Sequence, residues 1–300
     1  MTAFELPTTP REWQAVIGLD HQSFVKLTHL ADTFYRENRG CSYSEMLADN
    51  AKGHLARFKE LDDLIFFVLM MLKSGITFDL LGYIANIDQS NAHKKFKLGL
   101  EILNGTLKQS NYTPYRDFDE VSDLHRLIQP GQTIILDGTE QRVQRPSDQN
   151  VQREFYSGKK KGHTVKSLIM STSDRYVHYI SYCWVGRSHD FTVLKEEFPA
   201  ADGWFDPYVV RLDLGYHGFA NEYPNVKTFI PDKKPRGGEL SPDQIQRNKE
   251  LAKERIAVEH SIGGIKRYDF LSNTCRIHDW EIYDSVLETC AGLWNLFITR

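Results

Sequence analysis

Two apolar runs that each end in an aspartate constrain the fold of this 300-residue chain most strongly. Residues 133–136 are followed by Asp137, and residues 208–212 are followed by Asp213. Short apolar runs of this kind are consistent with buried β-strands. An acid at the tip of a buried strand is held on a rigid element at the edge of a sheet, where a cation can reach it. We therefore expect these two carboxylates to belong to one site.

A third acid, Glu259, lies in residues 248–268, whose pattern predicts a helix. At about 100° per residue, Arg255, Glu259 and Lys266 fall within about 40° of one another on one face. Alone, an Arg–Glu pair four residues apart is often a surface ion pair worth about 0.2–0.5 kcal/mol. The same helix also offers apolar residues for packing, namely Ile256, Val258, Ile262 and Ile265.

Three carboxylates converging from two strands and a helix would make a site for a hard cation, Mg²⁺ or Mn²⁺. Sites of this kind with two metal ions cut and rejoin phosphodiester backbones. The three acids are therefore candidate catalytic and metal-binding residues.

The pattern along the chain predicts two kinds of structure. Strand-like runs continue after Asp137 at residues 163–171, 175–184 and 226–230, and a helix is expected at 189–198. This mixed order implies an α/β fold, a mixed sheet covered by helices. The first third of the chain has helical spacing throughout. The expected domains are an N-terminal helical region (1–60), a second helical domain (61–112) and an α/β domain (130–300), with a linker over residues 105–131.

Residues 61–112 have the outline of a helix-turn-helix. An apolar helix over 62–73 is followed by a short helix that Thr77 can cap and by a longer one that begins near Asp88. Polar and basic residues near the start of the last helix are typical of DNA-reading helices. The alternative is a helical hairpin that packs against the rest of the chain. The candidate recognition-helix residues are Gln89, Ser90, Asn91, Lys94 and Lys95.

Composition and charge narrow the class of protein. With 41% hydrophobic and 26% charged residues and no run of roughly 18 apolar residues, the chain is expected to be globular and not membrane-bound. The N-terminus has no secretory pattern and the four cysteines form no CxxC pair, which indicates a reduced cytoplasmic protein without a structural zinc site. The net charge is −3, but residues 141–180 hold eight Lys or Arg against three acids. That patch is either a solvated loop or a surface for a polyanion.

Several sequence blocks in the right order resemble a known family. The blocks are Asp137-Gly138-Thr139-Glu140, Arg145-Pro146, Tyr156 to Lys166, Gly186 to Asp190, Asp213 to Gly218, and Asn248 to Lys266. Together they resemble the DDE transposases of bacterial insertion sequences, in the group related to the eukaryotic Harbinger elements. The resemblance implies a ribonuclease-H-like catalytic domain, preceded by a helix-turn-helix domain, in which Asp137, Asp213 and Glu259 are the metal-binding triad.

The resemblance also implies a function and partners. The expected activity is a transposase that binds element ends and catalyses metal-dependent cleavage and strand transfer of DNA, with two Mg²⁺ or Mn²⁺ ions per active site. The expected partner is double-stranded DNA, both terminal inverted repeats and target, bound by a homo-oligomer, with the protein nucleoid-associated when on DNA. Candidate phosphate contacts are Lys159, Lys161, Lys166, Arg255 and Lys266, and Asp190 is a candidate auxiliary acid. Ala252 stands where related transposases often have a tyrosine.

Two alternatives to an active transposase remain. One is a domesticated relative that keeps the fold as a DNA-binding protein or nuclease. The other is a metal-dependent hydrolase of small phosphate esters, which would need a closed pocket. Basic segments at 159–161 and 233–236 favour an extended polyanion as the substrate.

Overall fold

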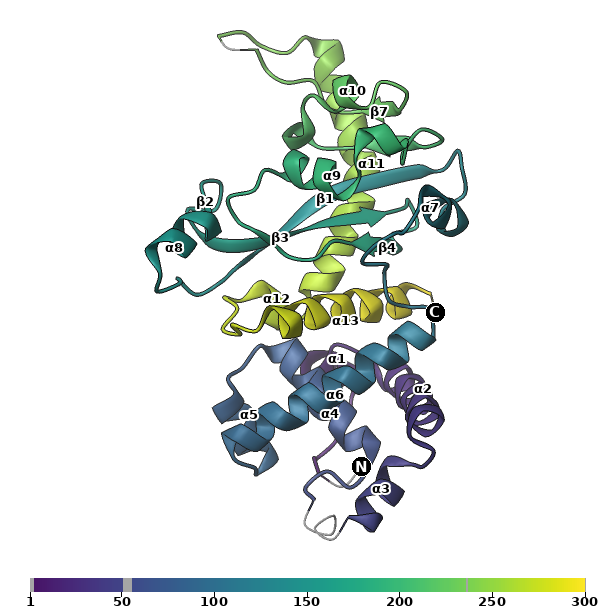
Figure 1. Cartoon of the computed structure of the whole chain (residues 1–300), viewed down its shortest axis with the longest axis vertical. Coiled ribbons are helices and arrows are strands. Elements are labelled where there is room, and N and C mark those ends of the chain that lie inside the picture. Colours follow the sequence, from purple (N-terminus) through teal and green to yellow (C-terminus); the bar gives the residue numbers. More distant parts are fainter. Residues whose placement is uncertain (1–2, 51–55, 236, 300) are drawn as a thin grey trace. The chain divides into compact units, whose positions relative to one another are not determined.

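The computed structural model describes residues 3–50, 56–235 and 237–299 (Figure 1). Arg236, part of the predicted basic segment 233–236, lies outside the described residues. The chain forms two compact units. Unit 1 combines Met1–Thr113 with Gly264–Arg300, and unit 2 is Pro114–Gly263. No helix among the described residues is long and apolar enough to cross a membrane.

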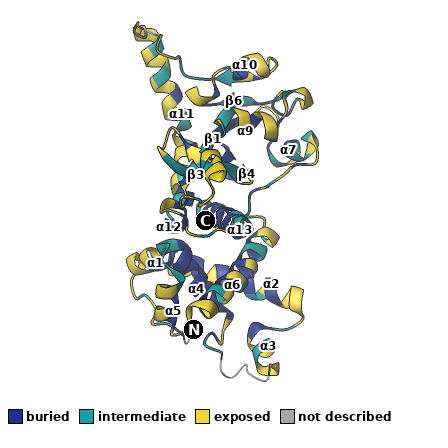
Figure 2. Cartoon of the chain, turned by 60° about the vertical axis from the view of Figure 1, so that its left-hand side comes forward, coloured by how far each residue is buried: buried dark blue, intermediate teal, exposed yellow. Residues whose placement is uncertain are grey.

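Unit 1 is made of helices. Its N-terminal part contains α1 (Pro10–Ile17), α2 (His21–Arg39), α3 (Tyr43–Asp49), α4 (Leu61–Ser74), α5 (Phe78–Ala85) and α6 (Gln89–Gln109). The apolar run predicted as one helix is α4, in which every residue from Asp63 to Leu72 is buried (Figure 2). Local signals set the ends of the shorter helices: Thr9 forms a capping box at the start of α1, and Gly18 ends it in a left-handed conformation.

The C-terminal part of unit 1 consists of α12 (Asp269–Ser272), α13 (Trp280–Ile298) and the last turn of α11 (Pro242–Lys266). The apolar face of α13 packs on α6, where the amide of Asn104 donates to Glu288 and Thr289 at 3.1 Å each. Unit 1 therefore takes in residues that the sequence pattern grouped with the α/β segment 130–300. The reason is that α13 is largely apolar and has to be covered.

One helix boundary differs from the sequence expectation. The predicted linker begins at residue 105, whereas α6 continues to Gln109. Gly105 therefore lies inside the helix, and a Cβ there would collide with the ring of Phe34. The glycine allows α2 to approach α6, so it serves close packing and does not end the helix.

Two adjacent glycines allow a test of the packing in unit 1. A Cβ at Gly264 would collide with the buried indole of Trp294, whereas a Cβ at Gly263 would meet nothing within 4 Å. We expect Gly264→Ala to lower the free energy of unfolding by about 1–3 kcal/mol, because the ring must shift in a packed core. Gly263→Ala, the control, is expected to be neutral or stabilising by up to about 1 kcal/mol, because alanine favours the helix. Urea unfolding of both variants measures the difference, and equal effects would contradict this account.

Unit 2 contains a mixed sheet, which confirms the predicted α/β class. Its described strands are β1 (Thr133–Arg142), β2 (Tyr156–Ser157), β3 (Gly162–Ser171), β4 (Val177–Ile180), β5 (Trp184–Val185), β6 (Val209–Arg211) and β7 (Lys227–Phe229). The main order is β2-β3-β1-β6-β7, and β4 and β5 also pair with β3. β1 is antiparallel to β3, while β1, β6 and β7 run parallel.

Helices accompany the sheet in unit 2: α7 (Val121–Leu127), α8 (Gln149–Phe155), α9 (Asp190–Glu197), α10 (Phe219–Glu222) and most of α11. Alternate residues of β1 and β3, such as Ile134, Leu136 and Leu168, enter a core with residues of α7, α9 and α10. α11 is tied to the sheet region by the hydroxyl of Ser261, which donates to the carbonyl of Arg175 at 2.8 Å. The buried parts of β1 and β6 therefore fix the positions of the residues that come just after them, Asp137 and Asp213.

Candidate functional site

The parallel pairing of β1 and β6 brings Asp137 and Asp213 next to each other. Ile135 of β1 is in register with Arg211 of β6, and each aspartate follows its paired residue by two positions. Neighbouring strands lie about 4.8 Å apart, so the two side chains leave the sheet at one edge of the parallel pair. The apolar runs before both acids are buried, as the sequence predicted, at Ile134, Leu136, Val210 and Leu212. Asp137 does not end its strand, however, because β1 continues past it to Arg142 along its pairing with β3.

A third carboxylate, Asp190 at the start of α9, joins them in what we call the carboxylate cluster (Asp137, Asp190, Asp213). Two glycines make room for it. A Cβ at Gly138 would lie 3.2 Å from the carboxyl carbon of Asp190. A Cβ at Gly215 would lie 2.9 Å from Oδ1 of Asp213 and 3.7 Å from Oδ2 of Asp190. A side chain at Gly138 would therefore press on Asp190, and one at Gly215 would press on Asp213 and touch Asp190.

Two cationic side chains pair with the cluster. Nη2 of Arg255 lies 3.1 Å from Oδ2 of Asp137, and Nζ of Lys166 lies 3.1 Å from Oδ1 of Asp190. Lys166 also donates to the carbonyl of Ser188 at 2.8 Å. Only 10% of the Lys166 side chain and 15% of the Arg255 side chain are exposed. Both pairs are therefore shielded from salt far more than surface ion pairs are.

The carboxylate cluster has more acidic groups than cationic partners, three carboxylates against Arg255 and Lys166. Burial raises the pKa of the Asp137 carboxyl above its usual value; Arg255 opposes this, and the charges of Asp213 and Asp190 add to it. Backbone N–H groups of Gly138 and Gly215 donate to Asp137 and Asp213 at 2.8 and 2.7 Å, which partly offsets the repulsion. The crowding of like charges means that added positive charge at this edge would be stabilising.

Tyr216 is the buried polar group of this region that sequence reasoning missed. Its side chain is fully buried, and its hydroxyl has no hydrogen-bond partner among the described residues. Burial, followed by the charges of Asp190, Asp137 and Asp213, raises the pKa of the Tyr216 hydroxyl well above its usual value. The group therefore stays protonated. The sequence signal that could have pointed to Tyr216 is its position three residues after Asp213, in the Asp-Leu-Gly-Tyr block.

The chemistry of the cluster fits a hard divalent cation. All three side chains offer carboxylate oxygens, which Mg²⁺ and Mn²⁺ prefer, and the charges of Asp213 and Asp190 add to the effect of burial in raising the pKa of Asp137. As arranged, no three His, Cys, Asp or Glu side chains in the described part of the chain are positioned to hold one ion. In this arrangement Oδ2 of Asp137 is paired with Arg255.

Glu259 is not part of the cluster in this arrangement. It lies on α11 and is exposed, four residues after Arg255, which contacts Asp137. Four residues of helix correspond to about 6 Å along the axis. Helix α11 therefore places Glu259 about one turn from Arg255, and its role as a metal ligand stays a prediction. Lys266 lies in the last turn of α11, in the part of that helix that belongs to unit 1.

Of the predicted phosphate contacts, Arg255 and Lys166 lie at the cluster, and Lys159 and Lys161 do not. The two lysines are exposed in the turn between β2 and β3. Asp137 pairs with Ile169 on β3, eight residues after Lys161. At about 3.4 Å per residue, Lys161 is roughly 27 Å along the strand from the level of Asp137.

The predicted recognition residues lie at the start of α6 in unit 1. α5 ends at Asn86 in the left-handed conformation, and the side chain of Asp88 caps α6 by accepting from the Asn91 N–H at 2.9 Å. A Cβ at Gly82 would lie 2.7 Å from the Ile87 carbonyl, so this connection is tight. Gln89, Ser90, Asn91 and Lys94 are exposed, and Lys95 is half-buried, where burial lowers the pKa of its ammonium. The helices form where the sequence predicts them, and contact with DNA stays a prediction.

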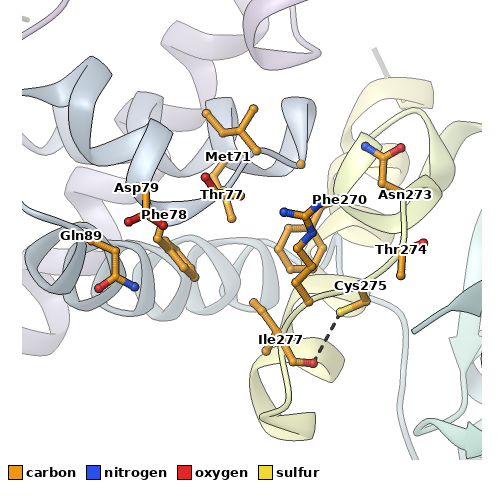
Figure 3. Close-up of a pocket in the computed structure, with 13 residues that line it drawn as sticks. Met71, Thr77, Phe78, Asp79, Gln89, Phe270, Asn273, Thr274, Cys275 and Ile277 are labelled. Atoms are coloured by element: carbon orange, nitrogen blue, oxygen red, sulfur yellow. Dashed lines mark hydrogen bonds between the residues drawn. The ribbon is translucent and has the colours of Figure 1, made fainter. Parts of the chain in front are cut away.

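A cavity of about 230 Å³ lies in unit 1, between the start of α5 and the segment that follows α12 (Figure 3). Phe78, Phe270 and Ile277 are among the residues that line it, and Gln89 of α6 also contributes. None of its lining residues belongs to the carboxylate cluster, which lies in unit 2. The cavity is therefore not the closed pocket that a hydrolase of small phosphate esters would place around its carboxylates.

Comparison with known proteins identifies relatives of this chain. The family model described as "DDE superfamily endonuclease" matches residues 136–295. A curated relative described as "Probable transposase for insertion sequence element IS702", from Microchaete diplosiphon, is 32% identical over 144 residues. That match covers 48% of this chain and 49% of the relative, so it spans about half the length of each. No solved structure matches the chain significantly.

Proposed function

The chain belongs to the DDE superfamily endonuclease family, and from this premise we propose that it is a transposase. It binds the ends of its element and catalyses metal-dependent cleavage and strand transfer of DNA, with unit 2 as a ribonuclease-H-like catalytic domain. The observation that carries this proposal is the parallel pairing of β1 with β6, by which Asp137 and Asp213 lie side by side. The relative's printed description as a probable transposase is consistent with it.

In this proposal Asp137, Asp213 and Glu259 hold two Mg²⁺ or Mn²⁺ ions. Bound there, the ions would activate the attacking hydroxyl and stabilise the leaving oxygen of the phosphodiester. The ion pair between Lys166 and Asp190 keeps the auxiliary carboxylate at a fixed place beside Gly138. The buried, protonated hydroxyl of Tyr216 adds no negative charge to the site.

Arg255 exchanges partners when DNA binds. In the structure its guanidinium neutralises Asp137. A DNA phosphate offers the same geometry of two acceptor oxygens to a planar guanidinium. With a cation held by Asp137, Arg255 would be free to donate to the phosphate, and Lys266 would add positive charge further along α11. Glu259, about one turn from Arg255 on the same face of that helix, would then complete the metal site.

Unit 1 reads the DNA. Helices α4, α5 and α6 have the order and tight connection of a helix-turn-helix, with exposed Gln89, Ser90, Asn91 and Lys94 at the start of the third helix. The DNA is double-stranded and includes terminal inverted repeats and the target. The protein acts as a homo-oligomer, because two element ends have to be joined to one target.

The test of the proposed function uses purified protein, the DNA that flanks its own coding region, and Mg²⁺. Cut positions are mapped on both strands by primer extension. We expect cleavage at the borders of short inverted repeats, which requires Mg²⁺ or Mn²⁺ and stops with a chelator. DNA binding without any metal-dependent cleavage would instead favour a DNA-binding protein derived from a transposase.

The tight approach of Asp190 to Gly138 provides a second test. Gly138→Ala is expected to displace Asp190, because the added methyl would lie 3.2 Å from its carboxyl carbon. Loss of an outer partner at a metal site typically costs 10–100-fold in metal affinity or activity, and we expect roughly that loss in Mn²⁺ affinity, measured by titration calorimetry, and in cleavage. Gly158→Ala is the control, because a Cβ at Gly158 meets nothing within 4 Å. Wild-type Mn²⁺ affinity in Gly138→Ala would rule out this role of Asp190.

A further inference from the structure

A segment of unit 2 extends beyond the sheet core along β1 and β3. It consists of residues 142–161, which include the end of β1, the helix α8 and the strand β2, and we call it the basic arm. In Figure 1, α8 and β2 lie at the far left, at the end of the long β1–β3 pair away from β7. None of the residues in α8 is buried, so this helix is not part of the core.

Polar contacts hold the basic arm together, with Val143 and Ser157 as its buried residues. Asp148 caps α8 by accepting from the Val151 N–H at 3.0 Å. The amide of Gln152 donates to the Pro146 carbonyl at 2.8 Å and accepts from Nε of Arg145 at 3.0 Å. Nη2 of Arg142 donates to the Lys160 carbonyl at 2.8 Å, which closes the arm at its base. A short exposed helix maintained by such contacts presents a defined surface to something outside the chain.

The charge of the basic arm indicates which kind of ligand its surface can bind. The basic arm contains six basic residues and two acids. The basic residues are Arg142, Arg145, Arg153, Lys159, Lys160 and Lys161, all of them exposed. None of the six forms an ion pair with another residue that the structure describes. Unpaired cations at this density, in a chain whose net charge is −3, fit a polyanion.

The strand register gives the distance from the cleavage site. Arg142 lies five residues after Asp137 on β1, or about 17 Å, and Lys161 lies at roughly 27 Å by the pairing with β3. Duplex DNA rises 3.4 Å per base pair along each strand. The basic arm is therefore too far away to touch the reacting phosphate, and it is placed at about five to eight base pairs from it.

From these observations we propose that the basic arm binds the backbone of duplex DNA about five to eight base pairs away from the cleaved phosphodiester. This inference rests on the proposed function, which supplies the DNA and the position of cleavage. The arm contributes affinity without sequence preference, since its side chains are lysines and arginines that contact phosphates. It fixes the direction in which the duplex leaves the active site.

The test compares two triple variants that change the net charge equally. The arm variant carries Lys159→Gln, Lys160→Gln and Lys161→Asn; asparagine is chosen because position 161 has a positive φ of 48°. The control variant carries Lys108→Gln, Lys195→Gln and Lys227→Gln, three lysines that are exposed elsewhere. Binding to the element end is measured from low to moderate salt, and hydroxyl-radical footprinting maps the protected backbone.

Each phosphate contact contributes roughly 0.9 to the magnitude of the slope of log Kobs against log salt concentration. Losing up to three contacts should therefore reduce that magnitude by about two to three. We expect this in the arm variant together with loss of protection five to eight base pairs from the cut, and neither change in the control variant. An unchanged slope, an equal loss in the control, or lost protection only next to the cut would overturn the proposal. If the wild-type protein itself neither binds nor cuts the element end, the proposed function fails first.

Discussion

Asp137→Asn, Asp213→Asn and Glu259→Gln are each expected to abolish Mg²⁺-dependent strand cleavage while leaving DNA binding in place. An amide keeps the shape of the side chain but removes the negative charge that a hard cation requires. The loss should exceed the roughly 100-fold that marks the upper range for an outer partner of a metal ligand. Cleavage is followed on a labelled element end with Mg²⁺ and again with Mn²⁺, and binding is followed by fluorescence anisotropy.

Glu250→Gln serves as the matched control for Glu259→Gln. Glu250 lies on the same helix, α11, and its carboxylate accepts only a surface hydrogen bond from Gln246 at 2.8 Å among the described contacts. We expect this variant to cleave like the wild type. Full cleavage by Glu259→Gln would remove that residue from the triad, and Asp190 would then be the third acid to consider, since it already lies beside Gly138 and Gly215.

Substitutions at the start of α6 are expected to weaken recognition of the element ends in two distinguishable ways. Gln89→Ala removes an exposed side chain suited to a base edge, so it should cost about 1–3 kcal/mol against the specific sequence and relax specificity there. Lys94→Ala removes a phosphate contact, so it should weaken binding to all sequences and lower the salt slope by about 1. Anisotropy with specific and scrambled duplexes over a range of salt separates the two effects.

Lys108→Ala is the control for α6, because Lys108 is exposed in the last turn of the same helix. Its salt slope should match that of the wild type. If Gln89→Ala and Lys94→Ala both bind like the wild type, α5 and α6 are a packing hairpin and another surface reads the DNA. Point variants are preferable to removal of residues 1–110, because that deletion would also strip α6 from the apolar face of α13.

The sequence was most informative where local pattern and burial agree. The run before Asp137 forms the buried part of β1, and the run before Asp213 includes β6, because each has enough apolar residues to enter the core. The breaks of the N-terminal helices were also readable, since Gly75 and Asn86 supply left-handed residues where α4 and α5 end. These features depend on neighbours in sequence.

Features that depend on contacts between distant parts of the chain could not be predicted from local sequence patterns. The pairing of β1 with β6 joins segments about 75 residues apart. The sequence predicted one site for Asp137 and Asp213, but only the register of the two strands shows how they become neighbours. The same holds for Lys166, predicted as a phosphate contact, whose ammonium group is occupied by Asp190 and Ser188. Helix α8 was also missed, because it has no buried face and therefore no apolar periodicity.

The discontinuous make-up of unit 1 has a consequence for protein synthesis. Unit 2 is one uninterrupted stretch, Pro114–Gly263, whereas unit 1 requires both Met1–Thr113 and Gly264–Arg300. Domains fold as units while the chain emerges from the ribosome, N-terminal parts first. Here the segment with the carboxylate cluster can fold before α13 is available to cover α6. A chain that stops near residue 263 would therefore contain the acids but lack the C-terminal helices of unit 1. The carboxylate cluster and a complete unit 1 are present in one molecule only after α13 has been translated.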